Sequence, residues 1–492
     1  MNDLKNKAVS GVKWSTLYSL ITVLISPLTL AILARILTPE EFGKIAIVTI
    51  IIGFSRQIAR MGFSKAIIQK DEVSDGDLSS IFWFEQLLGF FAFLIIYFSA
   101  GLIGSFFDAP GAVRLVRVAA LVFIFEPIDL VFRSLLKKEL KMKVLKISTS
   151  IRLIVVQITK IILAIMGFGA MSFVIGNIVG IFVLTVIMFY IFYKNKLWLP
   201  KMYFSFSQLK PYLKFGIFIS GKSIFNNLYN YIDEIIIGGI LGSEMLGIYH
   251  FAKRMLQYVI KLITQPIAEV GFPLLTKMTS DYKKFNRIYI KLIKFIGTVT
   301  IPAYAGIAAT APYFVPIIFG AKWIPAIPVI VILSIWGVFH SLQAGVISSA
   351  LYSFGKSDWM LYATILDLPI RAGLLYLAAP YGIEYIGLTI GFIVFAKFII
   401  YQYVLKYITD ISLINIVKEL KYIILSSILM LAALYLFDNL ISLSGILMLI
   451  LMIITGVLIY LVMMHILEKQ FVYSTVKMII NRKPINQLKD QD

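Results

Sequence analysis

Residues 36–43 have the sequence Ile-Leu-Thr-Pro-Glu-Glu-Phe-Gly, and residues 240–247 have the sequence Ile-Leu-Gly-Ser-Glu-Met-Leu-Gly. The two stretches share the pattern Ile-Leu-x-x-Glu-x-apolar-Gly and lie 204 residues apart. Each stretch is a short polar tip between two long apolar segments, as expected for a hairpin of membrane helices. The repeat therefore predicts a chain built from two related halves.

The composition around these tips predicts an integral membrane protein. Of the 492 residues, 60% are hydrophobic, and the mean hydropathy is +0.89. That is far more apolar surface than one globular core can bury. Apolar windows of about 20 residues match the hydrocarbon thickness of a bilayer, and they give about fourteen predicted helical spans. The predicted fold class is an all-α integral membrane protein.

The spacing of the two tips predicts how the halves are related. An even number of spans separates the copies, which makes the halves parallel and relates them by an axis along the membrane normal. We expect two pseudo-symmetric six-helix lobes around a central cavity, followed by two further helices. The predicted divisions are an N-terminal lobe at 1–207, a C-terminal lobe at 208–410, a helix pair at 411–470 and a basic cytoplasmic tail at 471–492.

The formal net charge of +20 has a topological explanation. Lysine and arginine concentrate in alternate connections between spans, whereas the intervening connections are nearly free of cations. This positive-inside pattern places both termini in the cytoplasm. No nucleic-acid recognition motif accompanies the cations, so we expect no nucleic-acid partner. The predicted location is the bacterial cytoplasmic membrane, which the chain crosses many times.

Several kinds of chemistry are disfavoured by what the sequence lacks. There is no cysteine, and the three histidines are far apart, so we expect no metal site. No nucleotide-binding loop or serine elbow is present, and a membrane glycosyltransferase would need a metal-binding carboxylate motif or a large external loop. We therefore predict a transporter without catalytic residues or a cofactor. Three energy sources stay open: an ion gradient, for which protons and sodium ions are the candidates, the membrane potential, and downstream consumption of the cargo.

A polar stripe follows the predicted span at residues 212–240. Lys222, Asn226, Asn230 and Asp233 are separated by steps of four, four and three residues, which place them on one face of a helix. We interpret this face as the border of a wet cavity, because charge accompanies the amides. The alternative is a row of hydrogen bonds that joins neighbouring helices.

Cations at membrane depth define the predicted cargo site. Fixed positive charge offsets the desolvation of an anion that passes through a membrane cavity. Arg60, close to the cytoplasmic end of its span, is expected instead to reach the interface. The predicted cationic site consists of Arg56, Arg152, Lys160 and Lys222, with Asn226 and Asn230 beside them.

Two sets of acids are predicted to take part in the transport cycle, one as a clamp or gate and the other in coupling. Folding the second hairpin about its tip places Asp233 opposite Arg254 and Glu234 opposite Lys253, as a structural clamp or as a gate. Acids in a low dielectric take up protons readily, and a proton or sodium ion bound there would couple transport to a gradient. The possible coupling acids are Glu85, Glu126 and Asp129.

Four segments together resemble a known family. Residues 11–48 and 233–255 surround the two tips, and residues 319–323 (FGAKW) and 349–358 (SALYSFGKSD) follow them. These segments are similar to the polysaccharide transporters, the Wzx-type oligosaccharide flippases of the multidrug/oligosaccharidyl-lipid/polysaccharide exporter superfamily. The resemblance implies a fold like that of the multidrug exporters and alternating access between two lobes.

The resemblance also implies a cargo. Members of the family are thought to move polyprenyl-pyrophosphate-linked oligosaccharide repeat units for capsule, O-antigen, exopolysaccharide or teichuronic-type polymers. The implied partners are this lipid-linked oligosaccharide, the membrane lipids and the polysaccharide polymerase machinery, and we expect a functional monomer. Two alternatives are a lipid II flippase and a multidrug or cation antiporter of the same superfamily.

Overall fold

The computed structural model describes residues 2–441, 443, 445–470 and 473. Side chains are described at these positions with the following exceptions: 2–9, 12, 58, 59, 214, 215 and 217–222. The described residues form helices joined by short turns, with no strand among them. The predicted all-α fold class is therefore confirmed.

Eleven segments within the described residues are long and apolar enough to cross a membrane. One of them, Ser223–Thr276, bends at Gly242 into two arms, because φ is 82° and ψ is 178° at that glycine. Two more predicted spans are absent from the eleven. The helix α2 (Pro39–Arg60) carries several charges, and the chain from residue 110 to 138 is broken into short helices. The count of about fourteen stays a prediction.

The chain folds as two compact units. The first unit comprises Met1–Phe251 and Leu361–Ile386, and the second comprises Ala252–Met360 and Gly387–Asp492. The two units are defined by contacts between residues, whereas the predicted lobes were defined by the repeat in the sequence. The predicted lobe boundary after residue 207 therefore stays a prediction.

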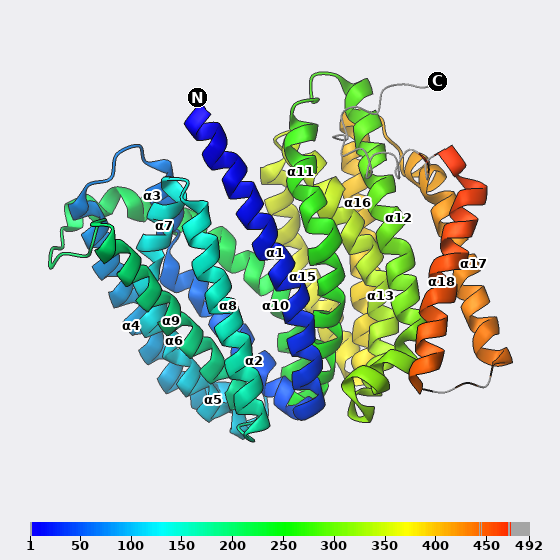
Figure 1. Ribbon diagram of the computed structural model, residues 1–492, viewed down its shortest axis with the longest axis horizontal. Helices are drawn as coiled ribbons and strands as arrows, with labels where there is room; N and C mark the ends of the chain where they lie inside the picture. Colours follow the sequence, from blue (N-terminus) through cyan, green and yellow to red (C-terminus); the bar gives the residue numbers. More distant parts are fainter. Residues whose placement is uncertain (1, 442, 444, 471–472, 474–492) are drawn as a thin grey trace. The chain divides into compact units, whose positions relative to one another are not determined.

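The first unit contains the buried acids Glu85, Glu126, Asp129, Asp233 and Glu234. In it, α8 packs beside both α1 and α9 (Figure 1). A short 3₁₀ turn at Glu126–Asp129 separates α6 from α7, and Pro127 in that turn lacks a backbone donor. The helices of this unit are α1 (Asn2–Ile36), α2, α3 (Phe63–Gln69), α4 (Asp75–Phe106), α5 (Pro110–Ala120), α6 (Val122–Phe125), α7 (Leu130–Lys138), α8 (Met142–Ile165), α9 (Met171–Lys194), most of α10 (Phe206–Val259), most of α15 (Ser357–Ala378) and the 3₁₀ turn Ala379–Tyr381.

The two repeated tips contact each other within the first unit. A Cβ atom added to Gly43 would overlap the carbonyl oxygen of Ser243, and one added to Gly247 would overlap the carbonyl oxygen of Pro39. Pro39 and Ser243 are equivalent positions of the repeat, so the contact is reciprocal. Only glycine permits this backbone approach, which explains the shared final glycine of the pattern.

The second unit is organised around one long helix. In it, α12 packs against α13, α17 and α18 (Figure 1). The hydroxyl of Tyr460 on α18 donates to the carbonyl of Thr298 on α12 at 2.8 Å, which ties the C-terminal pair of helices to this unit. Its helices are the end of α10, α11 (Gln265–Thr276), α12 (Tyr282–Phe314), α13 (Ala326–Leu342), α14 (Ser348–Ser353), most of α16 (Ile383–Thr409), α17 (Leu413–Leu440) and α18 (Gly445–Leu467), with π turns at Ile260–Thr264, Val315–Phe319 and Gln343–Ile347 and a 3₁₀ turn at Ala321–Trp323.

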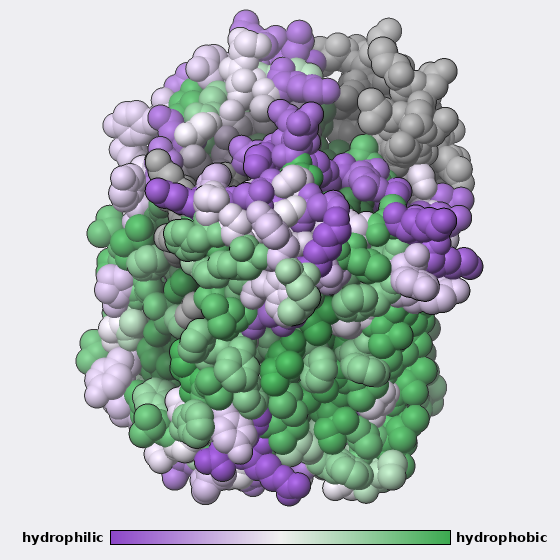
Figure 2. Space-filling view, turned by 90° about the vertical axis from the view of Figure 1, so that its left-hand side faces the viewer, coloured by the Kyte–Doolittle hydropathy of each residue, from purple (hydrophilic) through white to green (hydrophobic). Residues whose placement is uncertain are grey.

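Large apolar side chains cover the outside of these helices. On α4, for example, Phe98 is 74% exposed and Leu102 is 77% exposed. Figure 2 shows one face on which hydrophobic residues form a broad band, with hydrophilic residues above and below it. A surface of this kind is stable against lipid and not against water.

Candidate functional site

The first unit brings together a group of charged side chains, two buried acids and three half-buried arginines, that we call the arginine cluster: Arg56, Arg60, Glu126, Asp129 and Arg133. Arg56 and Arg60 lie on one face of the last turns of α2, because they are four residues apart. Glu126 and Asp129 lie at the two ends of the 3₁₀ turn, and Arg133 follows on α7. Both acids are almost fully buried.

The guanidinium groups neutralise the two acids directly. Arg56 Nε donates to Glu126 Oε2 at 2.7 Å, and Arg60 donates to the other carboxylate oxygen. Arg133 donates to Asp129 Oδ1 at 2.6 Å. Glu126 therefore accepts from two arginines at once, which offsets the desolvation of its buried charge.

Glu85 and Arg152 lie at the edge of the arginine cluster. Glu85 is fully buried, and neither of its carboxyl oxygens has a hydrogen-bond partner among the described residues. It lines a cavity of about 10 Å³ together with Arg56, Arg60 and Glu126, which is roughly the space for one water molecule. Arg152 forms no ion pair or hydrogen bond with the described part of the chain, although Glu126 acts on it electrostatically.

The arginine cluster brings together residues that were predicted separately. Arg56 and Arg152 were expected to bind cargo, and Glu85, Glu126 and Asp129 were expected to couple transport to a gradient. Their roles stay predictions. With Arg60 and Arg133 included, four arginines meet three acids, so at least one positive charge is left over when the acids are ionised.

The interpretation of Arg60 as an interface anchor was wrong, because its guanidinium pairs with Glu126. Depth within a single helix suggested the anchor, but the partner comes from a turn 66 residues away in sequence. Arg133 was counted only as a loop cation, and the sequence signal that identifies its role is the spacing of four residues from Asp129.

Lys160 occupies a different place in the first unit. It is buried between α8 and α9, with Nζ 3.7 Å from the centre of the Phe173 ring, at cation–π distance. Gly176 makes room for the lysine, since a Cβ at that position would overlap the aliphatic stem. The Phe173 ring thus holds the ammonium group in a defined position, and the predicted cargo role of Lys160 stays a prediction.

The polar stripe on α10 is described only in part. Asn226 and Asn230 have exposed side chains, as expected for residues that border water. The side chain of Lys222 lies outside the described residues. The predicted cargo role of all three residues stays a prediction.

A second group of buried side chains, the hairpin cluster, consists of Asp233, Glu234, Tyr249, His250 and Arg371. The Tyr249 hydroxyl donates to Asp233 Oδ2 at 2.5 Å, and Arg371 lies 3.6 Å from the same oxygen. His250 Nδ1 lies 3.1 Å from Glu234 Oε2. All five residues are buried. The two acids are thus held by the second arm of the bent helix α10 and by α15.

Tyr249, His250 and Arg371 were not predicted as site residues. Asp233 and Tyr249 are 16 residues apart, as are Glu234 and His250, which is the separation expected for two arms that meet at Gly242. Folding the hairpin at Gly242 would have identified both contacts from the sequence. Lys253 and Arg254 belong to the second unit, so their predicted pairing with the acids stays a prediction.

The described residues contain no cluster of three or more side chains that could hold a metal ion. The chemistry that the two clusters offer is electrostatic, since both consist of ionisable groups and hydrogen-bond donors at membrane depth. Such groups are costly in a bilayer and mark ion or substrate pathways.

Comparison with known proteins gives a consistent result. The family model described as "Polysaccharide biosynthesis protein" matches residues 32–328. The lipopolysaccharide biosynthesis protein WzxC of Escherichia coli K12 is 28% identical over 372 residues, which is 75% of each chain. The teichuronic acid biosynthesis protein TuaB of Bacillus subtilis 168 is 25% identical over 434 residues, covering 84% of this chain and 85% of the relative.

Solved structures show the same fold. The lipid II flippase MurJ, in an inward closed conformation, aligns with a TM-score of 0.77 at 16% identity, covering 94% of this chain and all of MurJ. An inward-facing multidrug transporter of the MATE family, from the same MOP superfamily, aligns with a TM-score of 0.57 at 16% identity, covering 84% and 95% of the two chains. The predicted exporter fold is confirmed.

Proposed function

Because the chain belongs to the polysaccharide biosynthesis protein family, we propose that it is a flippase for polyprenyl-pyrophosphate-linked oligosaccharides. It moves one repeat unit from the inner to the outer leaflet of the bacterial cytoplasmic membrane, where the unit enters a surface polysaccharide. The relatives named above act in lipopolysaccharide and teichuronic acid biosynthesis, two pathways that build surface polymers. The activity is transport and not catalysis.

The observation that carries this proposal is the position of Arg152 beside the arginine cluster. Arg56, Arg60 and Arg133 already contact Glu126 or Asp129, whereas Arg152 has no acid of its own among the described residues. A pyrophosphate carries more than one negative charge, and charge-assisted hydrogen bonds from guanidinium groups suit its oxygens. Arg152 is therefore the group that we expect to contact the cargo first.

The remaining predicted residues fit the same pathway. Asn226 and Asn230 present exposed amides that can bond to sugar hydroxyls, and Lys160 and Lys222 add positive charge. The reciprocal contact of Gly43 and Gly247 supports alternating access, because it joins the two halves predicted from the repeat at one point. A proton or sodium ion at Glu85 couples the cycle to a gradient.

The topology and assembly state form part of the proposal. Both termini lie in the cytoplasm, as the positive-inside pattern predicts. The protein acts as a monomer, because the internal repeat supplies both halves of the transport cycle. It delivers its cargo to the polysaccharide polymerase machinery at the outer leaflet.

Transport by purified protein in proteoliposomes tests the proposal. The cargo is a fluorescent polyprenyl-pyrophosphate oligosaccharide, and an external quencher reports its appearance in the opposite leaflet, with and without a proton or sodium gradient. Wild-type protein should move this cargo. Failure to move it, together with gradient-driven export of a cationic dye, would favour the multidrug antiporter, and movement of lipid II alone would favour the lipid II flippase.

A matched pair of arginine variants tests the site. Arg152→Ala should lower transport at least about 10-fold, because one charge-assisted contact to a phosphate is lost. Arg114→Ala, which removes an exposed arginine of α5 in the same unit, should transport like wild type. Lys160→Ala and Lys222→Ala should also abolish transport while the protein stays folded in the membrane. Wild-type transport by Arg152→Ala would overturn the assignment of the site.

A further inference from the structure

A pocket of the second unit is formed by residues that belong to neither cluster. Its volume is about 460 Å³, which is within the range of roughly 300–1,000 Å³ for small-molecule sites. The wall is formed by the start of α12, by the connection between α16 and α17, and by the start of α17. Its lining residues are Asn286, Arg287, Ile290, Lys291, Lys294, Asp410, Ile411, Asn415 and Glu419.

The wall of the pocket is fixed by hydrogen bonds and ion pairs. Asn286 Nδ2 donates to the carbonyl of Thr409 at 2.7 Å, which holds α12 against the end of α16. Lys294 Nζ lies 2.7 Å from Glu468 and 3.4 Å from Glu419, which joins α12 to α17 and α18. The charge of Lys294 is thus neutralised within the protein.

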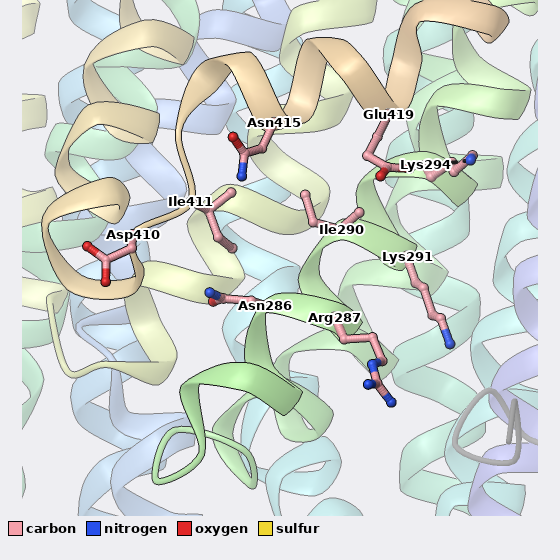
Figure 3. Close-up of a pocket in the computed structure, with 9 residues that line it drawn as sticks. All are labelled: Asn286, Arg287, Ile290, Lys291, Lys294, Asp410, Ile411, Asn415 and Glu419. Atoms are coloured by element: carbon pink, nitrogen blue, oxygen red, sulfur yellow. Dashed lines mark hydrogen bonds and ion pairs between the residues drawn. The ribbon is translucent and has the colours of Figure 1, made fainter. Parts of the chain in front are cut away.

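Two other cationic side chains of the pocket wall point the same way. Arg287 and Lys291 are four residues apart on α12, and Figure 3 shows them extending side by side from successive turns. Like charges at this spacing repel each other. Lys291 forms no ion pair or hydrogen bond with the described residues, and the acid Asp410 lies on the opposite side of the pocket (Figure 3). An anion held between the two cations would remove the repulsion.

Apolar residues lie next to these cations. Ile290 and Ile411 line the pocket, and Ile414 and Val417 on the adjoining turn of α17 are 65% and 52% exposed. A ligand that fills this site therefore needs an anionic group and an apolar part. In addition, Asn286 Oδ1 is buried without a partner among the described residues, so the wall retains an acceptor for a donor group.

The position of the pocket relative to the bilayer indicates which ligand can reach it. The positive-inside pattern places the start of α12 and the α16–α17 connection at the cytoplasmic surface, where anionic lipid headgroups gather. We propose that this pocket binds the phosphate headgroup of an anionic lipid of the cytoplasmic leaflet, with Arg287 and Lys291 on the phosphate and the acyl chains along α17. The bound lipid fastens α17 and α18 to α12.

Native mass spectrometry of the purified full chain tests the proposal, with phosphatidylglycerol and phosphatidylcholine titrated separately. The wild type should retain phosphatidylglycerol at least about 10-fold more tightly than phosphatidylcholine, and the double variant Arg287→Ala, Lys291→Ala should lose that preference. The matched control, Lys418→Ala with Lys421→Ala, removes two exposed cations of α17 outside the pocket and should keep the preference. Equal loss in both double variants would overturn the site.

Two further measurements distinguish a lipid from a free phosphate compound and provide a variant that is less disruptive to folding. Inorganic phosphate or glycerol 3-phosphate should not displace the lipid, and displacement by either at millimolar concentration would overturn the lipid assignment. If the double variant does not fold, the single variant Lys291→Gln should reduce the preference for phosphatidylglycerol about threefold. An unchanged preference in Lys291→Gln would overturn the proposal. The proposal rests on the proposed function only for the cytoplasmic orientation. No arm measures transport, so a negative result here leaves the transport proposal standing.

Discussion

The arginine cluster and the hairpin cluster of the first unit both bury two carboxylates, but different groups neutralise them. In the arginine cluster, Glu126 accepts from two guanidinium groups and Asp129 accepts from a third. In the hairpin cluster, a phenol and an imidazole contact the acids, and Arg371 stands 3.6 Å away, beyond hydrogen-bond distance.

This difference separates fixed charge from adjustable charge. A guanidinium group stays protonated at any pH that a protein experiences, so the arginine cluster always carries its positive charge. Tyrosine and histidine contact an acid while neutral, so a carboxyl in the hairpin cluster can gain a proton without breaking every contact. We therefore expect the arginine cluster to hold an anionic cargo and the hairpin cluster to act as the gate.

The largest effect should come from breaking the arginine cluster at its centre. Glu126→Ala leaves Arg56 and Arg60 without their acid. Breaking a buried pair costs about 3–5 kcal/mol of unfolding free energy, and we expect about 3 kcal/mol because both arginines are partly exposed to solvent. The measurement is thermal unfolding of purified protein in detergent. A second substitution, Arg56→Ala, should recover part of the loss, since the two sites share one network.

The control for this prediction is Glu139→Ala. Glu139 pairs with Lys141 at 2.6 Å, but both side chains are about half exposed, so the pair should contribute only about 0–1 kcal/mol. If Glu126→Ala and Glu139→Ala unfold at the same temperature, the arginine cluster is not the fixed, buried network described above.

A smaller effect is expected from Asp233→Ala in the hairpin cluster. This variant removes the carboxylate that accepts from the Tyr249 hydroxyl and faces Arg371, which should cost about 2–3 kcal/mol. Double-mutant cycles then identify the partners. Arg371→Ala should rescue part of the stability loss, and Arg254→Ala should do so only if the predicted pair with Asp233 also forms.

Transport separates the clamp from the gate in the same variants. If Asp233 is only a clamp, the rescued double variants should transport at a rate that follows their stability. If Asp233 is a gate, the double variants should be stable but inactive. Full transport by Asp233→Ala alone would exclude both roles.

The sequence predicted contacts within one hairpin or one repeat better than contacts between distant helices. The pattern at residues 36–43 and 240–247 located both tips, and their shared glycine marks the reciprocal backbone contact. The depth of Lys160 within its span was sufficient to predict a buried lysine. In contrast, Arg56 and Glu126 are 70 residues apart, and no spacing rule connects them. Only tertiary packing joins α2 to the 3₁₀ turn.

The hairpin cluster shows how one backbone angle limits such predictions. Positive φ at Gly242 sets the bend, and a shift of the bend by about two residues changes which side chains face Asp233. Glycine was visible in the sequence, but its φ was not. Arg371 comes from α15, and no spacing rule in the sequence connects it with Asp233.

A conservative variant of Tyr249 tests the hairpin cluster with a smaller loss of unfolding free energy. Tyr249→Phe removes only the hydroxyl that donates to the Asp233 carboxylate, and a hydrogen bond to a charged group should contribute about 1.5–2 kcal/mol. Tyr289→Phe is the matched control, because Tyr289 is equally buried but donates to the neutral amide of Gln402 at 2.6 Å. Its loss should be about 1 kcal/mol. Equal losses would contradict a stronger hydrogen bond at Tyr249 than at Tyr289.

The smallest effect on stability should come from Glu85→Gln, which is also the direct test of coupling. Neither oxygen of Glu85 has a donor among the described residues, so the change strands no partner and should shift the unfolding free energy by less than about 1 kcal/mol. Transport should nevertheless lose its response to a proton or sodium gradient, because an amide cannot take up a proton as a carboxyl does. The matched control is Glu72→Gln, which removes the charge of an exposed acid in the α3–α4 connection without touching the arginine cluster. If Glu85→Gln and Glu72→Gln respond to the gradient as the wild type does, the coupling acid must be sought among Glu126, Asp129 and the hairpin cluster. Asp233 and Glu234 are then the next acids to substitute, because they contact a phenol and an imidazole, whereas Glu126 and Asp129 accept from guanidinium groups.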